Sequence, residues 1–582
     1  MWIYGTAYPL RSVAEVISQE YDYIVVGGGT AGSALASRLS ESPEIRVVLL
    51  ERGPFDHSMR SRIPLASVAN GGYVVSRSSI PEPRTEQPVS LLCAETLGGT
   101  SRINGMIYTR GAPAYFDTWP RSGFDWSWKS VEPYFERVEQ ALSLRQTSHL
   151  ESAVYPFLAQ SARDVGLIPE EHPNQHGSSA LGYHNLDLTI DQRGYRHSAL
   201  DAYLPKNVAI ERQSRLHICT DAVVTRLDVD GRSGIARGVY VSPSKAEQPV
   251  QTAHLVTARR EIILAAGAIC TPQILQLSGI GPEAVLDGAG IPVARNLPGV
   301  GSRLSDHVLV PVSFEVAIED SLQQLQASIM SVIKNALLYA IAGKGWLKSA
   351  LDRGAFFSTS HIDDETGELR ETKATGDPFD PGHLPDAEII VLPIGLAPTK
   401  NAGRGLITLQ LSLTQPGLTS TGDVAVQSLD AGQSPRIRLN MLQGEEDRRA
   451  ARKALRFTLR LAEQFVFRSG YPKTARMFRH PVTDTDTLGG EWAEGSWRSV
   501  SDDSLDDYIS KNMASAYHLS SSCGIGEEDE GGVVDGQLRV HGFPNLRIAD
   551  ASVFPTTHPA HPMASVYMVA ERCADFVKER WE

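Results

Sequence analysis

The sequence predicts a mixed α/β protein with two lobes, because its 582 residues exceed the usual size of one domain. Near the N-terminus, two short apolar runs flank a glycine-rich helix, a pattern typical of buried parallel strands. Residues 308 to 502 differ in character and combine alternating strands with charged helices. The C-terminal segment returns to short apolar strands and a closing helix of small residues. We therefore expect the chain to leave its first lobe and come back to it.

The first lobe opens with a strand–helix–strand unit that carries G-x-G-x-x-G spacing. Its parts are the strand Tyr23–Val26, the glycines Gly27, Gly29 and Gly32, the helix Ala31–Leu39 and the strand Val47–Leu50. The glycines suit a tight turn, a close approach to a pyrophosphate, and close packing of helix on strand. The helix N-terminus offers N–H groups and partial positive charge to phosphates. Glu51 ends the second strand at the ~20-residue distance where an acid binds an adenosine ribose, so the unit predicts a dinucleotide site.

The composition argues against several classes of partner. The net charge of −13 disfavours binding to nucleic acid or to an anionic membrane surface. No apolar run reaches ~18 residues, so we expect no membrane span. The N-terminal residues lack the apolar core of a signal peptide, no Asn-x-Ser/Thr sequon occurs, and the five cysteines have no disulfide or metal spacing. These features predict a reduced, cytoplasmic setting and no metal site, unless a leader has been removed.

The next segments contain glycine and then tryptophan. In Leu97–Met106, two adjacent glycines precede small hydroxyl residues. Such a backbone can pass close to a ligand, although an ordinary glycine turn has the same pattern. Trp119, Trp126 and Trp128 are expected to pack in the interior rather than stack on a substrate.

Further elements are expected in order along the chain. In the first part they are a helix starting at Ser198–Leu204, one strand over Leu216–Leu227, and a buried strand Ile262–Ala268 that feeds a helix through Gln276. In the middle block they are a helix over 322–342, a surface loop over 363–385, strands at 387–392, 405–413 and 422–427, and a charged helix over 445–465. At the end they are parallel strands at 538–540 and 546–550 and a helix over 563–578.

Six separated motifs in order resemble the glucose–methanol–choline (GMC) family of flavoprotein oxidoreductases over essentially the whole chain. They are GGGTAG at 27–32 with Glu51, LGGTSRIN at 97–104, GAICTPQILQLSGIG at 267–281, LPGVGSRLSDH at 297–307, YHLSSSCGIG at 517–526 and LRIADASVFPTTHPAHPM at 546–563. The resemblance implies a Rossmann-type FAD-binding lobe and a substrate lobe with an antiparallel sheet covered by helices. It implies an FAD-binding domain at 20–110, 195–310 and 515–582, and a substrate-binding domain at 111–194 and 311–514.

The resemblance also implies which residues contact FAD. It places Thr30 and Ala31 at the pyrophosphate, Glu51 at the ribose, Thr100 and Asn104 at the flavin, the Val223 backbone at the adenine, and Asp550 and Ala551 at the phosphate and ribityl chain. The rest of the expected cofactor set is Gly27, Gly29, Gly32, Gly105, Met106, Pro562 and Met563. Some members tether FAD through a histidine of the LGG segment. Ile103 occupies that position here, so we expect non-covalent FAD.

Two positions depart from the family pattern. Glu95 stands where the family usually has a basic residue, and this difference is expected to alter the pairing of charged side chains on this loop. The family segment H-P-V-G-T-C-R-M-G reads His518–Gly526 here, with the histidine and cysteine present and the arginine and methionine absent. This departure is expected to affect the fine structure of the site more than its chemistry.

The resemblance assigns His518 and His561 as the catalytic residues. A neutral imidazole suits removal of a hydroxyl proton because its ordinary pKa of ~6.5 lies near the operating pH. His561 would hydrogen-bond the substrate oxygen and stabilise a developing alkoxide. His558 competes for this second role, but the His-Pro-Met run before the last helix favours His561. His307 and Cys523 are expected to be structural.

The leading functional hypothesis is FAD-dependent oxidation of an alcohol, aryl or from secondary metabolism, by hydride transfer to flavin N5. The alternative is a member that retains FAD but closes a ring without redox chemistry, with the same histidines as acid and base. Oxygen or another acceptor would reoxidise the flavin, and the chain would be a monomer or a homodimer. A nicotinamide dehydrogenase is disfavoured, because it needs neither the LGGTS motif nor the C-terminal motifs.

Overall fold

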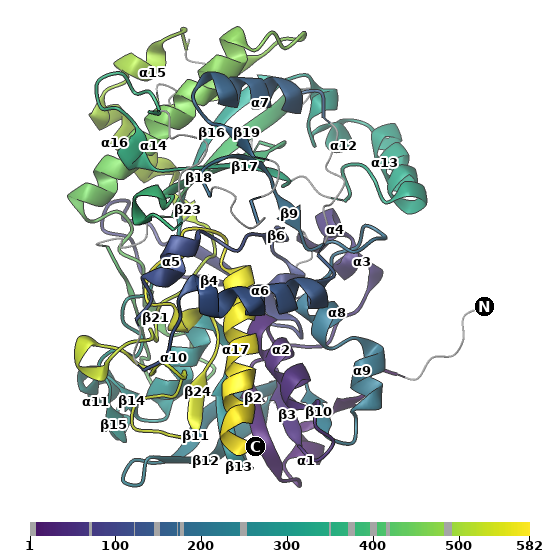
Figure 1. Ribbon diagram of the computed structural model, residues 1–582, viewed down its shortest axis with the longest axis vertical. Helices are drawn as coiled ribbons and strands as arrows, with labels where there is room; N and C mark the ends of the chain where they lie inside the picture. Colours follow the sequence, from purple (N-terminus) through teal and green to yellow (C-terminus); the bar gives the residue numbers. More distant parts are fainter. Residues whose placement is uncertain are drawn as a thin grey trace.

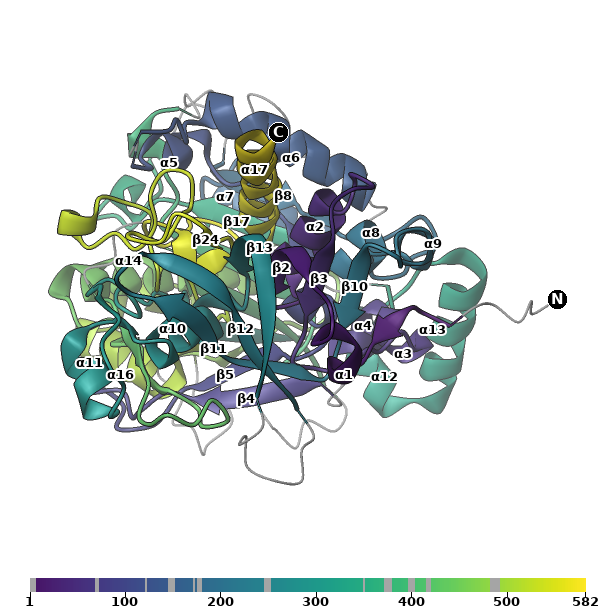
Figure 2. The same ribbon diagram turned by 90° about the horizontal axis from the view of Figure 1, so that it is seen from below.

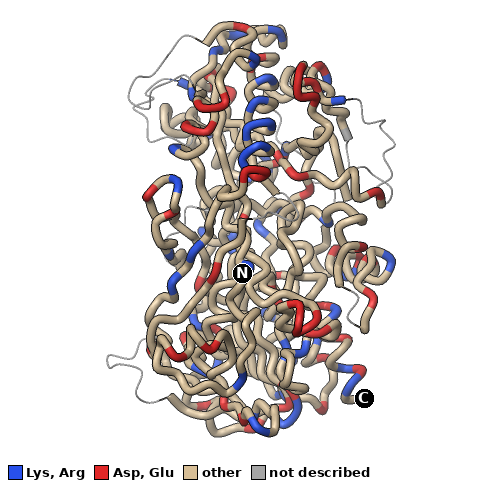
Figure 3. The backbone as a smooth tube through the Cα atoms, turned by 90° about the vertical axis from the view of Figure 1, so that its left-hand side faces the viewer, with Lys and Arg blue, Asp and Glu red and all other residues tan. Residues whose placement is uncertain are grey.

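The computed structural model describes residues 7–68, 73–120, 123–144, 152–170, 173–174, 180–244, 253–348, 351–370, 379–395, 404–414, 420–481 and 492–582. Two lobes follow one another along the long axis, each built around a large sheet (Figure 1). Acidic and basic residues are interspersed over the face in Figure 3. None of the described helices combines the length and the apolar character needed to cross a membrane.

The sheet of the lower lobe has the strand order β1-β10-β3-β2-β13-β12-β11, and β24 also pairs with β13. Its strands are β1 (Leu10–Arg11), β2 (Tyr21–Val26), β3 (Val47–Leu50), β10 (Leu216–Cys219), β11 (Ala222–Asp230), β12 (Ile235–Pro243), β13 (His254–Leu264) and β24 (Leu546–Ile548). Pairing is parallel from β1 to β13 and between β13 and β24, whereas β11 and β12 are antiparallel. Helices α2 (Thr30–Leu39) and α17 (Met563–Trp581) pack together over this sheet (Figure 2).

The sheet of the upper lobe has the order β22-β16-β19-β18-β17-β8-β7, and β23 also pairs with β16. Its strands are β7 (Pro169–Glu170), β8 (Gly182–Asn185), β16 (Val308–Val316), β17 (Arg353–Phe357), β18 (Ala387–Leu392), β19 (Gly405–Leu413), β22 (Arg476–Arg479) and β23 (Ala514–Ser515). All described pairs are antiparallel except β7–β8. Helices α7 (Tyr155–Asp164), α14 (Glu445–Glu463) and α16 (Asp502–Asn512) cover the outer face of this sheet.

Strand β19 explains why this sheet has two different faces. Leu409 and Leu411 alternate with Gln410 and Ser412 along the strand. Successive side chains of a strand point to opposite faces. The leucines enter the core beneath α14, whereas Gln410 and Ser412 line a cavity on the other side. The alternation therefore gives the sheet one apolar face and one partly polar face.

The remaining elements connect and flank the two sheets. They are α1 (Val13–Val16), α3 (Met59–Arg62), α4 (Pro64–Val68), β4 (Val74–Ser78), β5 (Ser90–Ala94), β6 (Ile107–Tyr108), α5 (Pro113–Asp117), α6 (Trp128–Leu142), β9 (Asp187–Leu188), α8 (Ala199–Tyr203), α9 (Lys206–Glu211), α10 (Gly267–Leu277), β14 (Ile280–Gly281), α11 (Glu283–Gly288), β15 (Arg295–Asn296), α12 (Gln324–Ala327), α13 (Ile329–Ala342), β20 (Asp423–Ala425), β21 (Arg436–Arg438) and α15 (Ser496–Ser499).

Most of the expected helices and strands are present, but three expectations were wrong. The single strand over 216–227 is two strands, because Asp221 adopts a left-handed φ of 53° between β10 and β11. The helix over 322–342 is broken at Ser328, whose extended backbone and side chain cap α13. Leu538 has a φ of 65°, so residues 538–540 make only isolated bridges instead of a strand. The loop expected at 363–385 lies partly outside the described residues, because 371–378 are not described.

The tryptophans of the first lobe pack in the interior, as expected. Trp119, Trp126 and Trp128 are all buried, and Trp119 lies 5.4 Å from Trp126 between ring centroids. Trp128 stacks on Phe135 of α6 at 5.6 Å. These rings therefore stabilise the packing of α6 rather than form a surface for stacking a ligand.

Candidate active site

A cavity of about 880 Å³ lies between the two sheets. Its lower wall contains the start of α2, the end of β3 and the turn after Gly98, and its upper wall contains residues of β16, β18 and β19. The cavity brings together every cofactor and catalytic residue expected from the sequence except Gly32: Gly27, Gly29, Thr30, Ala31, Glu51, Thr100, Asn104, Gly105, Met106, Val223, His518, Asp550, Ala551, His561, Pro562 and Met563. Gly32 lies behind this surface.

The glycines make a floor without side chains. A Cβ at Gly32 would lie 1.8 Å from the carbonyl oxygen of Gly27, so this glycine permits packing rather than contact with a ligand. A Cβ at Gly99 would lie 2.6 Å from the Cα of Gly29, so the two glycine-rich turns meet backbone to backbone. No side chain caps α2 at Gly29. The N-terminus of α2 thus presents backbone N–H groups to the cavity, which suits a phosphate-bearing ligand.

Glu51 is buried where β3 ends at the cavity. Its carboxylate accepts hydrogen bonds from the backbone N–H groups of Gly28 and Gly53, each at 2.7 Å. Burial raises the pKa of Glu51 to about 7, although these hydrogen bonds oppose the rise. The two backbone donors therefore fix the orientation of this carboxylate at the cavity wall.

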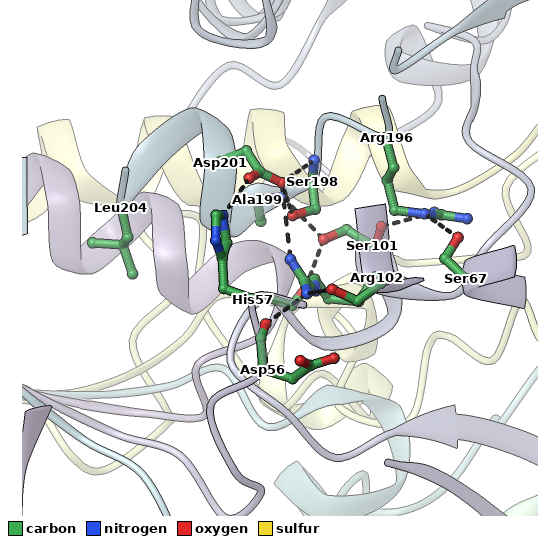
Figure 4. Close-up of polar contacts among 12 residues, drawn as sticks. Asp56, His57, Ser67, Ser101, Arg102, Arg196, Ser198, Ala199, Asp201 and Leu204 are labelled. Atoms are coloured by element: carbon green, nitrogen blue, oxygen red, sulfur yellow. Dashed lines mark hydrogen bonds and ion pairs between the residues drawn. The ribbon is translucent and has the colours of Figure 1, made fainter. Parts of the chain in front are cut away.

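Two buried arginines hold the turn after Gly98, and sequence reasoning missed both (Figure 4). The guanidinium of Arg102 donates to the carbonyl oxygen of Asp56 and to Ser61 Oγ, both at 2.6 Å. Asp201, whose side chain completes the capping box of α8 with the N-cap residue Ser198, lies 3.9 Å from Arg102. Arg102 thus connects the turn to α3 and to the segment directly before it.

Arg196 fixes the same turn from the other side (Figure 4). Its guanidinium donates to the carbonyl oxygen of Ser101 at 2.9 Å and to Asn104 Oδ1 at 2.7 Å. Burial, with a smaller effect from Arg102, lowers the pKa of Arg196 to about 9. A charged residue inside an otherwise small-residue motif, as Arg102 is, was the one signal in the sequence for this network.

Asp306 positions the loop that carries His518. Its Oδ1 accepts the backbone N–H groups of His518 at 2.8 Å and of His307 at 2.9 Å, and its Oδ2 accepts from Ser515 Oγ. Burial raises the pKa of Asp306 to about 7. Tyr517, directly before His518, adopts a left-handed φ of 62°, so the loop stores local backbone strain beside the cavity.

A chain of hydrogen bonds sets the tautomer of His518. His307 Nε2 lies 2.7 Å from the carbonyl oxygen of His558, which can only accept, so the ring carries its proton on Nε2. Burial lowers the pKa of His307 to about 3 and leaves the ring neutral, with a bare Nδ1. His518 Nδ1 lies 2.8 Å from that atom and must therefore donate to it. Burial also lowers the pKa of His518 well below its ordinary value, so its Nε2 is an unprotonated acceptor.

His561 has a different partner. Its ring lies 4.7 Å from that of His518 between centroids, and its Nε2 lies 2.9 Å from Oε1 of the buried Glu388 on β18. Glu388 Oε2 and the neighbouring Ser412 Oγ have no hydrogen-bond partner among the described residues. Two acceptors of the upper sheet are thus available to a bound molecule.

His558 lies outside the cavity lining. Its Nε2 lies 2.7 Å from Ser565 Oγ, and its ring packs against Tyr115 at 4.9 Å. The structure therefore places His561, and not His558, beside His518.

Cys523 is buried, and burial raises the pKa of its thiol. Glu95 forms ion pairs with Arg77 at 2.9 Å and with Arg52 at 3.6 Å at the cavity wall.

Comparison with protein families decides the identity of the chain. The N-terminal model of the GMC oxidoreductases matches residues 21–309, and the C-terminal model matches residues 419–570. The chain belongs to the GMC oxidoreductase family. This GMC oxidoreductase is an FAD-dependent enzyme acting on CH–OH donors, so the expected family, fold class, enzyme class and cofactor are confirmed.

Relatives match this GMC oxidoreductase over nearly its whole length. An oxygen-dependent choline dehydrogenase of Pectobacterium carotovorum is 30% identical over 586 residues, which cover 96% of this chain and 95% of the relative. The dehydrogenase pkfF of Emericella nidulans is 28% identical over 616 residues, which cover 96% and 93%. A formate oxidase of Aspergillus oryzae has a TM-score of 0.81 at 24% identity, covering 97% of this chain and 98% of that one. A fungal aryl-alcohol oxidase has a TM-score of 0.75 at 22% identity, covering 97% and 99%.

Proposed function

We propose that this GMC oxidoreductase oxidises an alcohol to a carbonyl compound with His518 as the general base. The observation that carries the proposal is the bare Nε2 of His518 at the cavity, which follows from the hydrogen-bond chain through His307. Bound FAD supplies the hydride acceptor, flavin N5. The glycine floor, the uncapped start of α2 and the fixed carboxylate of Glu51 fit its diphosphate and ribose.

His518 takes the hydroxyl proton of the substrate on Nε2. Its lowered pKa keeps the ring neutral at neutral pH, so the accepting form is the populated one. His307 holds Nδ1 of His518 in the donor state, which keeps the reactive nitrogen directed to the substrate.

His561 binds the same oxygen from the other side. Its Nε2–H donates to the buried carboxylate of Glu388, which fixes the orientation of the ring. We propose that the ring held in this way hydrogen-bonds the substrate oxygen and helps to stabilise a developing alkoxide. Under this proposal His518 removes a proton, whereas His561 stabilises the negative charge that removal creates.

The upper wall suits an alcohol with both apolar and polar parts. Leu309, Ile390 and Leu392 line it together with Gln410 and Ser412. We propose an aryl or secondary-metabolite alcohol, in keeping with the aryl-alcohol oxidase and the fungal dehydrogenase among the similar proteins. FAD is proposed to be non-covalent, because Ile103 carries no atom that can bond to it; acid precipitation should release the yellow cofactor into the supernatant.

The test is anaerobic mixing of the holoenzyme with a panel of alcohols. Bleaching of the oxidised flavin band, with formation of the aldehyde or ketone, supports the proposal. Peroxide detection in parallel with a dye acceptor then distinguishes oxygen from another acceptor. If a substrate is turned over without any bleaching and its product is an isomer, the non-redox ring closure through the same histidines replaces this proposal.

A further inference from the structure

Helix α13 presents its apolar side outward. Ile329, Leu337 and Ile341 are 74%, 56% and 82% exposed. Its other exposed large apolar residues are Met330, Val332, Ile333 and Leu338. A surface helix of a globular protein normally turns such residues towards the core. Figure 1 shows α13 at the edge of the molecule, with α12 beside it.

Two polar residues of α13, Asn335 and Tyr339, face the protein instead. Asn335 is buried, and its Oδ1 accepts the backbone N–H of Trp346 at 3.2 Å. Tyr339 is also buried, and its hydroxyl donates to the carbonyl oxygen of Gly194 at 3.0 Å. These contacts fix the rotation of the helix about its own axis. The hydrogen bonds of Asn335 and Tyr339 therefore determine that the apolar side of the helix points outward.

Basic residues surround this apolar side. Residues 321–351 contain three lysines, Lys334, Lys344 and Lys348, and no aspartate or glutamate. Lys334 and Lys344 are exposed. Across the contact with Gly194, the exposed Arg193 adds a further positive charge. Residues 321–351 thus carry a net charge of +3 on a chain whose net charge is −13, with Glu319 and Asp320 directly before them and Asp352 directly after them.

We propose that the exposed side of α13 docks this enzyme onto an anionic lipid surface. An exposed apolar helix face bordered by lysines inserts at the boundary between headgroups and acyl chains, while the lysines contact anionic headgroups. The expectation from net charge concerned the whole chain and does not describe this local region. A second copy of the chain fits less well, because a symmetric contact through α13 would bury the lysines of both copies in one interface, and residues 321–351 offer them no acidic partner.

The segment that follows α13 reaches the wall of the cavity. Leu351, in this segment, lines the cavity. Trp346 packs with Leu322 beneath α13 and is buried. A docked α13 would therefore hold one wall of the cavity close to the lipid surface.

The experiment measures sedimentation of the holoenzyme with vesicles of phosphatidylcholine containing about 30% phosphatidylserine, at low salt. The native enzyme is expected to co-sediment with these vesicles and to be released by high salt. The double variant Leu337→Asp/Ile341→Asp is expected to lower the partition coefficient about tenfold or more. The double variant Lys334→Ala/Lys344→Ala is expected to lower it about fivefold per lysine.

Matched controls lie elsewhere on the surface. Leu429→Asp replaces an exposed leucine and Lys129→Ala an exposed lysine, and both are expected to leave binding unchanged. Flavin absorbance and turnover with a soluble alcohol report that each variant is folded. The proposal is overturned if the native enzyme does not bind these vesicles or if the controls weaken binding equally. It is also overturned if the α13 variants convert a dimer to a monomer in sedimentation analysis with vesicle binding unchanged.

Discussion

The two histidines of the cavity have the same side chain but different neighbours. The ring of His518 is held by the neutral imidazole of His307, whereas the ring of His561 is held by the carboxylate of Glu388. Their centroids are only 4.7 Å apart. The imidazole of His307 accepts the Nδ1–H of His518 and leaves Nε2 of His518 as an acceptor, whereas the carboxylate of Glu388 accepts the Nε2–H of His561. Under the proposed function, these different neighbours give the two histidines different roles.

The strongest test of this contrast is removal of the proposed base. His518→Ala is expected to lower kcat by about 10²–10⁴ while the flavin spectrum persists, because the variant lacks the proposed acceptor of the hydroxyl proton. Steady-state kinetics with the best alcohol of the panel measure it. His561→Asn, which retains a hydrogen-bond donor, is the comparison and should lose less. Equal small losses for both variants would contradict the division of roles.

Loss of His307 should have the next largest effect. His307→Ala removes the acceptor of the His518 Nδ1–H, so both tautomers of His518 become populated and the ring can rotate. We expect kcat to fall about 10²-fold, within the range for a misplaced general base. The acid limb of the kcat/KM profile should also move, which a purely structural loss would not cause. An unchanged profile together with a lowered melting temperature would leave His307 a packing residue.

Removal of the charge beside His561 is expected to have a moderate effect. Glu388→Gln keeps the shape of the side chain but loses a charge-assisted hydrogen bond, so kcat should fall about tenfold. Ser412→Ala is the matched control, because Ser412 pairs with Glu388 across the sheet and lines the same cavity but carries no charge. This control should stay within about threefold of the native kcat. A loss in the control as large as in Glu388→Gln would assign Glu388 to substrate binding alone.

The smallest effect concerns pH. Burial lowers the pKa of His518, and the neutral ring is the active form, so activity is lost only when the pH falls below that lowered pKa. We therefore expect kcat/KM to stay level as the pH falls from 7 through 6.5. A titration with an inflection at or above the ordinary pKa of histidine would show that the base is another group.

The sequence predicted the residues on the cofactor side of the cavity better than the side chains that hold them in place. Gly27, Gly29 and Glu51 follow a spacing that the geometry of a phosphate-binding turn imposes, so a local pattern was enough. Arg102 and Arg196 are far apart in sequence and meet around Ser101 only in the fold, which no local pattern encodes. His307 was expected to be structural, but its contact with His518 joins two distant motifs. The domain boundaries stay predictions.

The upper lobe illustrates the same limit. The alternation in β19 predicted a strand, and the strand is present. Which of its two sides meets the cavity depends on α14 and on the register with β18, because Glu388 pairs with Ser412. Asp221 and Leu538 changed the expected strands through single left-handed residues, and neither aspartate nor leucine signals such a conformation as glycine does.

One carboxylate controls the mutual alignment of two of the imidazoles. Asp306 Oδ1 receives the main-chain amides of both His307 and His518, so these rings cannot shift independently. Proton acceptor and orienting neighbour thus behave as one rigid unit anchored at a single atom. Changes elsewhere in the opposite sheet, away from Glu388, can therefore adapt the cavity to new alcohols without disturbing the alignment of these two rings.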